Sequence, residues 1–374
     1  MDSIHFDDGK EKILVKKILM FVYSDLKTDA RVMRSIDALK DQYDITILAT
    51  NSSNEKKVDG YRYLNVIDMS VKNPLVRYLK CIKKVCSYIK NNDFDALYCH
   101  DYYAAPVLLV SLICKRSRKM IYDAHELYIP NTSSSIREKI TFFIEKRAIQ
   151  KADLVICASE RRKEIMKKNF SVKRDIEVIN NISILPQEHI DFTDNQEVDL
   201  FLSNQKKTVV YCGALMYARR PDLLIDAAES LQDKIQVLII GNGDEKAKLK
   251  QRVMDRCLSN VKFMDSIPYK SIYGWISRCD IGYLYYDNSN LNNSNCAPNK
   301  IFEYASAGLP MVGNDNPGLT DYFSRYSIGE TNDDIVKAIN GVIEKYDIYK
   351  RSMGKFLNDF SWEKEKKRLL DAVD

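Results

Sequence analysis

The feature that most constrains this fold is a regular alternation of short apolar runs with segments of helical periodicity. Residues 16–24, KKILMFVYS, are an apolar run of the kind found in buried parallel strands, and residues 29–41 then show helical spacing, with Asp29 as the expected N-cap. Further apolar runs occur at residues 43–50, 94–100, 119–125 and 153–159. Strands that alternate with helices predict a parallel sheet with right-handed crossovers.

The alternation is interrupted once and then starts again. Residues 186–206 are polar and lack sustained periodicity, which is typical of a linker between domains. Apolar runs then resume at residues 207–213, 235–241, 261–267, 281–286 and 310–313. This predicts an α/β chain with two Rossmann-like, doubly wound parallel-sheet domains, 1–185 and 207–355, which face a central ligand-binding cleft. The last helical segment, 356–374, could cross back to the first domain.

Length and composition agree with a two-domain enzyme. The chain has 374 residues, of which 45% are hydrophobic and 29% charged, and no window approaches the roughly 18 apolar residues of a membrane span. The first residues lack the basic and apolar regions of a secretory signal, so we expect a cytoplasmic protein. Nine scattered cysteines without a C-x-x-C pair indicate reduced thiols rather than disulfides or a zinc site.

Residues 75–90 combine apolar residues at helical spacing with several lysines, which predicts a basic amphipathic helix. Such a helix can be an ordinary surface helix that packs its apolar stripe on the core. It can also attract the anionic lipids of a membrane surface, which would place the protein at the inner face of the cytoplasmic membrane. Nucleic acid is not an expected partner, because the basic residues do not interleave with exposed aromatic residues in a recognisable module.

The segment PNKIFEYASAGLPMV places a single carboxylate, Glu303, on a short amphipathic helix that is followed by Ala-Gly-x-Pro and an apolar run. A lone helical glutamate is usually solvated. However, the segment resembles the donor-binding helix of the retaining glycosyltransferases with the two-Rossmann-domain (GT-B) architecture, family 4 in particular. The resemblance extends over nearly the whole chain. It implies that Glu303 binds the ribose hydroxyls of a nucleotide, and that Pro298, Asn299 and Lys300 at the helix N-terminus face the diphosphate.

One position departs from the family pattern. The family normally has another glutamate eight residues before the one that corresponds to Glu303, and this earlier glutamate contacts the transferred sugar. This chain has Asn295 at that position. An asparagine can hydrogen-bond a sugar hydroxyl, but it cannot place negative charge near a developing oxocarbenium ion. We therefore expect a different donor, or a larger donor-binding role for the segment NDNPGL, which contains Asn316, Gly318 and Leu319.

The segment YCGALMYARR resembles the family's diphosphate-binding loop, which begins at Gly213 here. Ala214 occupies the position of the family's arginine, and Arg219 that of its lysine, with Arg220 next to it. A departing nucleotide diphosphate needs cationic neutralisation, so we expect Arg219 to supply it ahead of Arg220. The alternative is a pair of solvated arginines at a helix start.

A second loop of the same domain contains the glycine pair Gly241 and Gly243 between an apolar run and a helix. Such glycines are common for backbone reasons alone. In the context of the resemblance they would let the loop approach the nucleotide, and Ile267 in the segment MDSIP would lie at the edge of the base.

In the first domain, YDAHELY resembles the family's Asp-x-His-Glu segment at the end of a strand. His125 would hydrogen-bond the donor sugar unless it is a structural histidine, and Glu126 would lie on the acceptor side. His100 and Asp101 end the neighbouring strand, where acceptor contacts and loop capping are both open. Arg31 is a candidate for phosphate or acceptor binding, with a surface helix charge as the alternative.

The resemblance implies transfer of a hexosyl or N-acetylhexosaminyl group, from a UDP-sugar by preference, to a polysaccharide or lipid-linked glycan with retained configuration. The candidate catalytic residues are His125, Arg219, Lys300 and Glu303. No cofactor or metal is expected, because no Asp-x-Asp or metal-ligand cluster is evident. Two alternatives stay open: a nucleotide-sugar epimerase or inverting GT-B transferase, and a partner subunit that binds a nucleotide-sugar without catalysis, which Ala214 and Asn295 together would suit.

Overall fold

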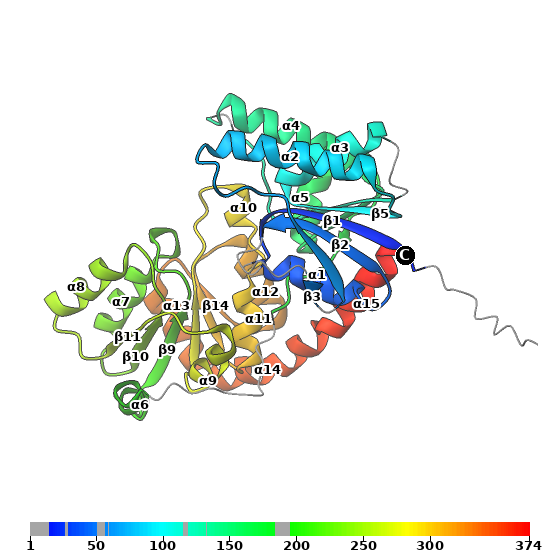
Figure 1. Cartoon of the computed structure of the whole chain (residues 1–374). Coiled ribbons are helices and arrows are strands. Elements are labelled where there is room, and N and C mark those ends of the chain that lie inside the picture. Colours follow the sequence, from blue (N-terminus) through cyan, green and yellow to red (C-terminus); the bar gives the residue numbers. More distant parts are fainter. Residues whose placement is uncertain are drawn as a thin grey trace, which may run out of the picture.

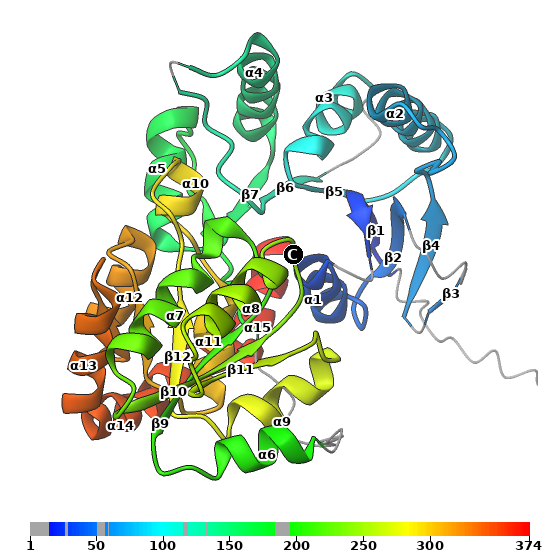
Figure 2. The same ribbon diagram turned by 90° about the vertical axis from the view of Figure 1, so that its left-hand side faces the viewer.

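The computed structural model describes residues 15–26, 29–50, 57–58, 60–114, 119–131, 133–183 and 195–374. It contains two α/β domains, each built on one twisted sheet with helices on both faces (Figure 1). The expected pair of Rossmann-like domains is therefore confirmed. In the view of Figure 2, α1 and α15 lie between the two sheets.

The N-terminal sheet has eight strands in the order β3-β4-β2-β1-β5-β6-β7-β8, and every neighbouring pair except β3–β4 is parallel. Its central strands are almost wholly buried, as continuous apolar runs require when helices cover both faces. The strands are β1 (Lys17–Asp25), β2 (Asp44–Thr50), β3 (Lys57–Val58), β4 (Tyr61–Asn65), β5 (Ala96–His100), β6 (Lys119–Ala124), β7 (Leu154–Cys157) and β8 (Glu177–Val178).

All but one of the five helices described in this domain begin at side-chain caps that the sequence supplies. Asp29 caps the first helix by accepting from the Val32 N–H, as expected, and Ser135 with Glu138 forms a capping box. The helices are α1 (Ala30–Leu39), α2 (Pro74–Asn91), α3 (Ala105–Cys114), α4 (Ile136–Lys151) and α5 (Glu160–Phe170), with a 3-10 turn, η1 (Tyr102–Ala104).

The C-terminal sheet has six parallel strands in the order β11-β10-β9-β12-β13-β14. Two buried clusters of apolar side chains cover its two faces. The strands are β9 (Lys207–Cys212), β10 (Ile235–Ile240), β11 (Val261–Met264), β12 (Ile281–Leu284), β13 (Met311–Gly313) and β14 (Gly329–Thr331). The helices and 3-10 turns are α6 (Gln196–Leu202), η2 (Tyr217–Arg219), α7 (Pro221–Ser230), α8 (Lys246–Asp255), η3 (Tyr269–Ser271), α9 (Ile272–Ile276), α10 (Leu291–Ser294), α11 (Asn299–Ser306), α12 (Pro317–Tyr326), α13 (Ile335–Glu344), α14 (Tyr346–Asp359) and α15 (Trp362–Val373).

The last helix crosses back to the N-terminal domain. Leu369 and Val373 of α15 are buried in the apolar cluster under β1 and β2, and the Glu365 carboxylate accepts from the backbone and side-chain N–H groups of Asn180. The Lys119 ammonium donates to the carbonyl groups at the end of the helix. The expectation that the C-terminal helix could cross back is thus confirmed, and α15 lies beside α1 in Figures 1 and 2.

Several elements were not expected from the sequence, among them β4, α5, α12 and α14. The strand β4 is half-exposed and has only the two-residue β3 outside it in the sheet, and α12 begins with Pro-Gly, a pair that suggests a loop. The predicted linker, residues 186–206, contains α6 in its second half, while its residues 186–194 lie outside the described residues. Among the described helices, none is long and apolar enough to cross a membrane.

The loops that follow β9 and β10 pack against each other at backbone distance. The N–H of Gly213 donates to the Ile240 carbonyl, and Leu215 N–H donates to the Asn242 carbonyl. Gly241 has φ of +152°, and a Cβ atom there would lie 1.9 Å from the carbonyl oxygen of Gly213. The turn therefore requires glycine, for steric and conformational reasons together.

Replacing Gly241 with alanine should lower the free energy of unfolding by at least about 2 kcal/mol, because the new methyl group meets backbone at a backbone angle that side chains rarely adopt. Gly354→Ala is the matched control. A Cβ atom added at this exposed glycine of α14 would meet no other atom within 4 Å, so alanine should raise stability by about 0.5–1 kcal/mol. Urea denaturation measures both, and equal stabilities would contradict the packing described for the two loops.

Candidate functional site

The helix α11 presents a polar N-terminus at the carboxyl end of the C-terminal sheet. Pro298 precedes the helix, and no side chain caps its first N–H groups, whereas Asn316 caps the neighbouring α12. The Asn299 Oδ1 atom is buried and has no hydrogen-bond partner among the described residues. Free N–H groups and the helix dipole at such an end favour an anion.

Glu303 is 4% exposed and lies one turn inside this helix. Its carboxylate forms an ion pair with Lys300 and accepts a hydrogen bond of 3.2 Å from the Ser183 hydroxyl. The interpretation of Glu303 as a solvated helix residue is therefore wrong. Burial would lower the pKa of Lys300, but nearby Cys212 and the carboxylate of Glu303 raise it, so this lysine is a cation.

The two arginines after β9 have different surroundings. Arg220 adopts a left-handed backbone conformation, and its guanidinium forms a bidentate pair with Asp222 at 2.9 Å. The guanidinium of Arg219 instead lies 3.9 Å from the centre of the Tyr286 ring and has no carboxylate partner among the described residues. Arg219 is thus the arginine whose charge is available to a ligand, while that of Arg220 is used locally.

The glycines of this region have a structural explanation that differs from the expected one. The loop of Gly241 and Gly243 approaches the backbone at Gly213 and Leu215, and a Cβ atom on Gly243 would lie 2.2 Å from the Leu215 carbonyl oxygen. The tight approach is therefore between two protein loops. Ile267, expected at the edge of a base, is half-buried against the core of the C-terminal domain.

The asparagine at the family's second glutamate position does not present a free side chain. Asn295 is 3% exposed, its Oδ1 accepts from the Arg161 guanidinium, and its Nδ2 donates to the Leu291 carbonyl at 2.8 Å. The prediction that Asn295 contacts the transferred sugar is therefore not met in this structure, where its side chain bonds to the protein instead. Both hydrogen-bonding groups of Asn295 are already engaged within the protein.

The expected donor-binding role of the segment NDNPGL is not met in this structure either. The Asn316 side chain is completely buried, its Oδ1 accepts from the N–H groups of Gly318 and Leu319, and its Nδ2 donates to the carbonyls of Tyr286 and Asn293. Leu319 itself is buried in the apolar core. These residues hold the loop between β12 and α11 in place, and their polar groups are not free for a donor.

Arg162 joins the two domains. Its buried guanidinium donates to the His125 carbonyl in the N-terminal domain, and to Asn292 Oδ1 at 2.9 Å and the Asn295 carbonyl at 3.0 Å in the C-terminal domain. The N–H of Leu127 donates to the same Asn292 oxygen at 2.9 Å. Together these bonds attach α5 and the end of β6 to the loop that leads into α11.

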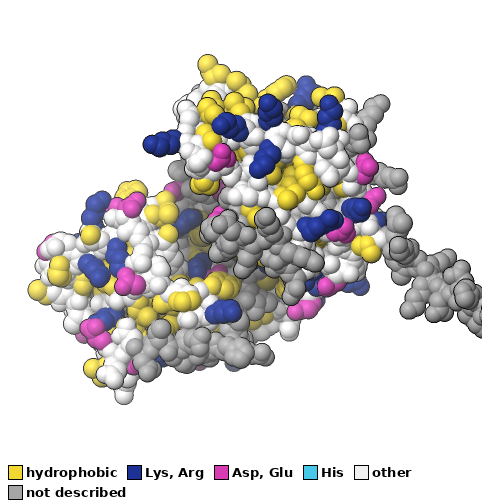
Figure 3. Space-filling model, viewed as in Figure 1, with side chains coloured by type: hydrophobic (Ala, Val, Ile, Leu, Met, Phe, Trp, Pro, Cys, Tyr) yellow, Lys and Arg dark blue, Asp and Glu magenta, His cyan; other side chains and the backbone are white. Residues whose placement is uncertain are grey.

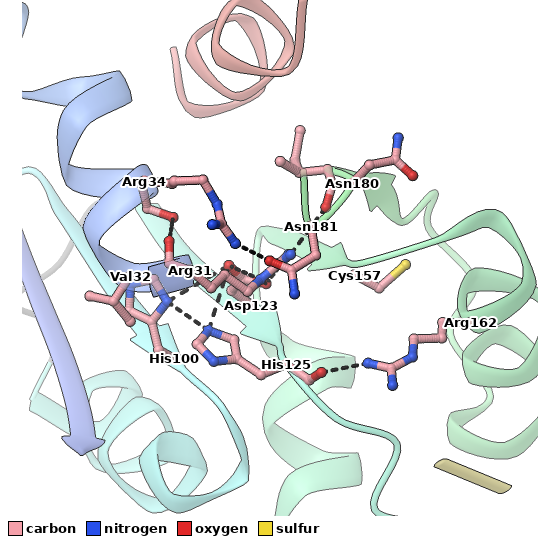
Figure 4. A network of polar contacts seen from close by, with 12 residues as sticks. Arg31, Val32, Arg34, His100, Asp123, His125, Cys157, Arg162, Asn180 and Asn181 are labelled. Carbon is pink, nitrogen blue, oxygen red and sulfur yellow. Dashed lines mark hydrogen bonds and ion pairs between the residues drawn. The ribbon is translucent and has the colours of Figure 1, made fainter. Parts of the chain in front are cut away.

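A second polar network lies at the carboxyl ends of β5 and β6 (Figure 4). Arg31 of α1 is buried and makes a bidentate pair with Asp123, with its closest N–O distance at 2.7 Å, and it also donates to the Ile179 carbonyl. Burial would raise the pKa of Asp123, but the permanent positive charge of Arg31 outweighs this and lowers it. Neither interpretation of Arg31 fits, since it is not a surface charge and its guanidinium is already paired.

His100 and His125 complete this network. His100 Nδ1 lies 3.2 Å from His125 Nε2, and His100 Nε2 is buried without a partner among the described residues. Burial lowers the pKa of His100 to about 3, and it also lowers that of His125. Both rings are therefore neutral at physiological pH. The His125 side chain keeps 15% of its surface exposed, and His100 is fully buried.

The ligand atoms of His100, Asp123 and His125 lie within 4.8 Å of one another, as a metal site would require. However, the Asp123 carboxylate also accepts from Arg31 and from the Tyr98 hydroxyl. A cation placed there would lie close to the Arg31 charge and would have to compete with these donors. The chemistry of the cluster fits a hydrogen-bond network better than a metal centre.

Asp101 combines backbone strain with an unpaired carboxylate oxygen. Its φ is +64°, a region that non-glycine residues rarely adopt, and its N–H donates to the Asp123 carbonyl at 2.8 Å. The Oδ1 atom is buried without a partner among the described residues, and burial raises the pKa of the carboxyl to about 7. Glu126, expected on the same side, is exposed to solvent.

Residues 30–182 match a family model described as Glycosyltransferase Family 4, and residues 192–356 match one described as Glycosyl transferases group 1. The chain belongs to the GT-B glycosyltransferases. It is 21% identical to the uncharacterized glycosyltransferase MJ1069 of Methanocaldococcus jannaschii, over 74% of each chain. It is 26% identical to TuaH of Bacillus subtilis, a putative teichuronic acid biosynthesis glycosyltransferase, over 60% of this chain and 58% of that protein.

Solved structures show the same fold. The Anabaena protein Alr3699/HepE, crystallised with UDP, superposes with a TM-score of 0.72 at 16% identity, over 96% of this chain and 99% of its own. WaaG, a glycosyltransferase of lipopolysaccharide biosynthesis, gives a TM-score of 0.68 at 11% identity, over 94% and 98%.

Sequence reasoning missed Asp123, Arg162 and Ser183. Asp123 had a signal, because an acidic residue inside the otherwise apolar run of β6 needs a buried partner. For Arg162 the signal was weaker, namely an Arg-Arg pair in the first turn of α5 after the Ser159 N-cap.

Replacing Asp123 with asparagine should lower the free energy of unfolding by about 3–5 kcal/mol, because it leaves the buried Arg31 charge without a counter-ion. Asp44→Asn is the matched control. Asp44 pairs with Arg62 at 2.8 Å, but both side chains are substantially exposed, so the loss should stay below about 1 kcal/mol. Chemical denaturation of the two variants checks the difference, and similar losses would argue against the role given to the buried pair.

Asp101 should make stability depend on pH in a defined direction. Its folded pKa of about 7 is above the usual 3.8, so the folded protein favours the protonated carboxyl, and ionisation costs stability as the pH rises from about 4 to 7. Asp101→Asn is uncharged throughout and avoids this cost. Compared with the wild type, the variant should gain more than about 1 kcal/mol between pH 4 and pH 8, measured by thermal or urea unfolding. Parallel stability profiles for the two proteins would exclude the raised pKa.

Proposed function

We propose that this glycosyltransferase moves a hexosyl or N-acetylhexosaminyl group from a nucleotide-diphosphate-sugar to an acceptor hydroxyl with retained anomeric configuration. A UDP-sugar is the favoured donor. Support comes from the solved structures of Alr3699/HepE, which were determined with UDP and with UDP-glucose. The acceptor is a polysaccharide or lipid-linked glycan, which the similarity to TuaH, a putative teichuronic acid biosynthesis enzyme, supports.

The observation that carries this proposal is the uncapped N-terminus of α11 together with Lys300, and with Glu303 one turn further along the helix. The diphosphate would meet the free N–H groups and the Lys300 ammonium, with Arg219 supplying a further positive charge. The ribose hydroxyls would donate to Glu303 and replace the Ser183 hydroxyl at its Oε1 atom.

The proposed reaction is a front-face substitution. The acceptor oxygen forms a bond to the anomeric carbon as the bond from that carbon to the diphosphate oxygen breaks, and the departing phosphate oxygen takes the acceptor proton. Arg219, Lys300 and the α11 N–H groups stabilise the charge on the leaving group. His125, neutral and partly exposed, would hydrogen-bond the sugar from the opposite domain. In this proposal no metal or other cofactor takes part, because the protein's own cations balance the diphosphate.

A contact with an anionic membrane surface is also proposed, at the inner face of the cytoplasmic membrane. The helix α2 exposes Leu75, Val76 and Leu79 together with lysines, and α4 exposes Ile136, Ile140 and Phe143. Figure 3 shows lysine and arginine side chains interspersed with hydrophobic ones over this end of the N-terminal domain. Apolar residues that enter the head-group region, with basic residues around them, are typical of peripheral membrane binding.

Calorimetric titration of UDP, GDP, ADP and their glucose and N-acetylglucosamine conjugates tests the donor site. One nucleotide, UDP by preference, should bind, and Glu303→Ala should weaken it at least tenfold, or about 1.4 kcal/mol. The exposed Glu363 of α15 provides the matched control, because Glu363→Ala makes the same change on a helix of the C-terminal segment and should leave the affinity unaltered. Excess EDTA should have no effect on the binding.

Absence of binding by all these nucleotides would contradict the donor site. NMR of the product tests the stereochemistry, since a retained anomeric coupling supports the front-face reaction and an inverted one excludes it. Release of free nucleotide with a new glycoside excludes an epimerase, whereas binding without hydrolysis or transfer would indicate a non-catalytic subunit.

A further inference from the structure

A cavity of about 700 Å³ opens in the N-terminal domain between α2, η1 and α4. Its volume is within the usual range for small-molecule sites, roughly 300–1,000 Å³. The lining includes Tyr23, Tyr78, Tyr102, Tyr103 and Tyr128, and we call it the tyrosine pocket. None of the residues discussed for the donor lines this cavity, so it is a separate feature of the chain.

The five tyrosine rings form one continuous series. Tyr78 meets Tyr23 at 5.1 Å between ring centres, Tyr23 meets Tyr103 at 5.2 Å, and Tyr103 meets Tyr102 at 4.3 Å. Tyr102 then stacks on Tyr128 at 4.8 Å, with the ring planes 15° apart. The rings come from β1, α2, η1 and the loop after β6, so segments distant in the sequence bring them together.

The chemistry of this lining suits sugar rings. A pyranose has an apolar face of C–H bonds and a polar rim of hydroxyls, and a tyrosine has an apolar ring face and a polar hydroxyl. Tyr103 is 38% exposed, and the other four rings are partly exposed, so the series lines the cavity rather than forming a closed core. A rigid series of partly exposed rings offers contact area at a low cost in side-chain entropy.

The same pocket has a positive charge. Arg77 and Arg137 line it, and neither guanidinium is paired with a carboxylate among the described residues. The one acidic lining residue, Glu138, is engaged in the capping box, where its carboxylate accepts from the Ser135 N–H and hydroxyl. Two unpaired arginines next to aromatic rings favour a ligand that carries a carboxylate or a phosphate.

The strained residue described above is next to the pocket in the sequence. Asp101 directly precedes the lining residue Tyr102 and is the N-cap residue of η1, which follows the carboxyl end of β5. A glycan held against Tyr102 and Tyr103 would therefore lie near the carboxyl end of β5. This position is compatible with an acceptor and not with the nucleotide, whose proposed site is on the other domain.

We propose that the tyrosine pocket binds the acceptor, and that this acceptor is a glycan with an anionic group, a carboxylate or a phosphate, beside Arg77 and Arg137. The inference rests on the proposed transfer reaction, and it adds the chemical class of the acceptor. The sugar rings lie on the tyrosines, and the two arginines distinguish charged glycans from neutral ones.

Binding of four probes to the full chain tests this, by calorimetry or NMR titration in about 150 mM salt, where non-specific charge attraction is screened. Tetragalacturonate is compared with maltotetraose, and maltose 1-phosphate with maltose. At least one anionic probe should bind tenfold or more tightly than its neutral partner, and the pair that shows the preference identifies carboxylate or phosphate. The double variant Arg77→Gln/Arg137→Gln should lose the preference, whereas Arg147→Gln, an exposed arginine of α4 that does not line the pocket, should keep it.

Tyr103 provides a second test that does not depend on charge. Tyr103→Ala should weaken both charged and neutral probes about tenfold, and Tyr103→Phe, which keeps the ring, should stay within twofold of the wild type. The proposal is overturned by equal affinity for charged and neutral probes, by no binding of either anionic probe, or by a preference that survives in the double variant. A UDP titration separates the donor-site hypothesis from the acceptor-pocket hypothesis. If UDP does not bind but the preference for anionic glycans is intact, only the donor-site hypothesis is contradicted.

Discussion

The buried ion pair between Arg31 and Asp123 is the interaction on which the N-terminal half of the site depends. It joins α1 to the end of β6, and through the Ile179 carbonyl it also fixes the segment that leaves β8 toward the other domain. Asp123 in turn lies against both histidines, so the direction of the His125 ring depends on a charge that no ligand would touch. Because each ion would be costly alone in this interior, the pair is maintained only as a unit.

The fold was largely predictable because its signals are local. Continuous apolar runs such as β1 and β10 identify buried parallel strands, and the Asp29 and Ser361 caps mark helix starts within a few residues. Elements without such signals were missed. The strand β4 is half-exposed and lies second from the sheet edge. The helix α12 starts with Pro317 and Gly318, a pair whose local preference is for a turn and which becomes helical because the buried Asn316 caps it.

The site was predictable only where one short segment contains the relevant residues. Lys300 and Glu303 lie on one helix three residues apart, so their pairing follows from helical geometry. Arg31 and Asp123 are 92 residues apart, and Arg161 and Asn295 are 134 apart, in different domains. A sequence shows that these residues are polar but not which partner will use their hydrogen bonds. For this reason Arg31, Asn295 and Asn316 were expected at ligands and lie instead in the framework.

The return of α15 to the first domain means that the polypeptide passes between the domains twice. The first passage follows β8, and the second runs through α14 and α15, with the Asn180–Glu365 hydrogen bonds joining the two passages. Two adjacent connections constrain how the domains can move relative to each other. Rotation about an axis through both connections is the motion that they would oppose least. Such a rotation would separate the Arg162 contacts between the domains while the two passages stay together.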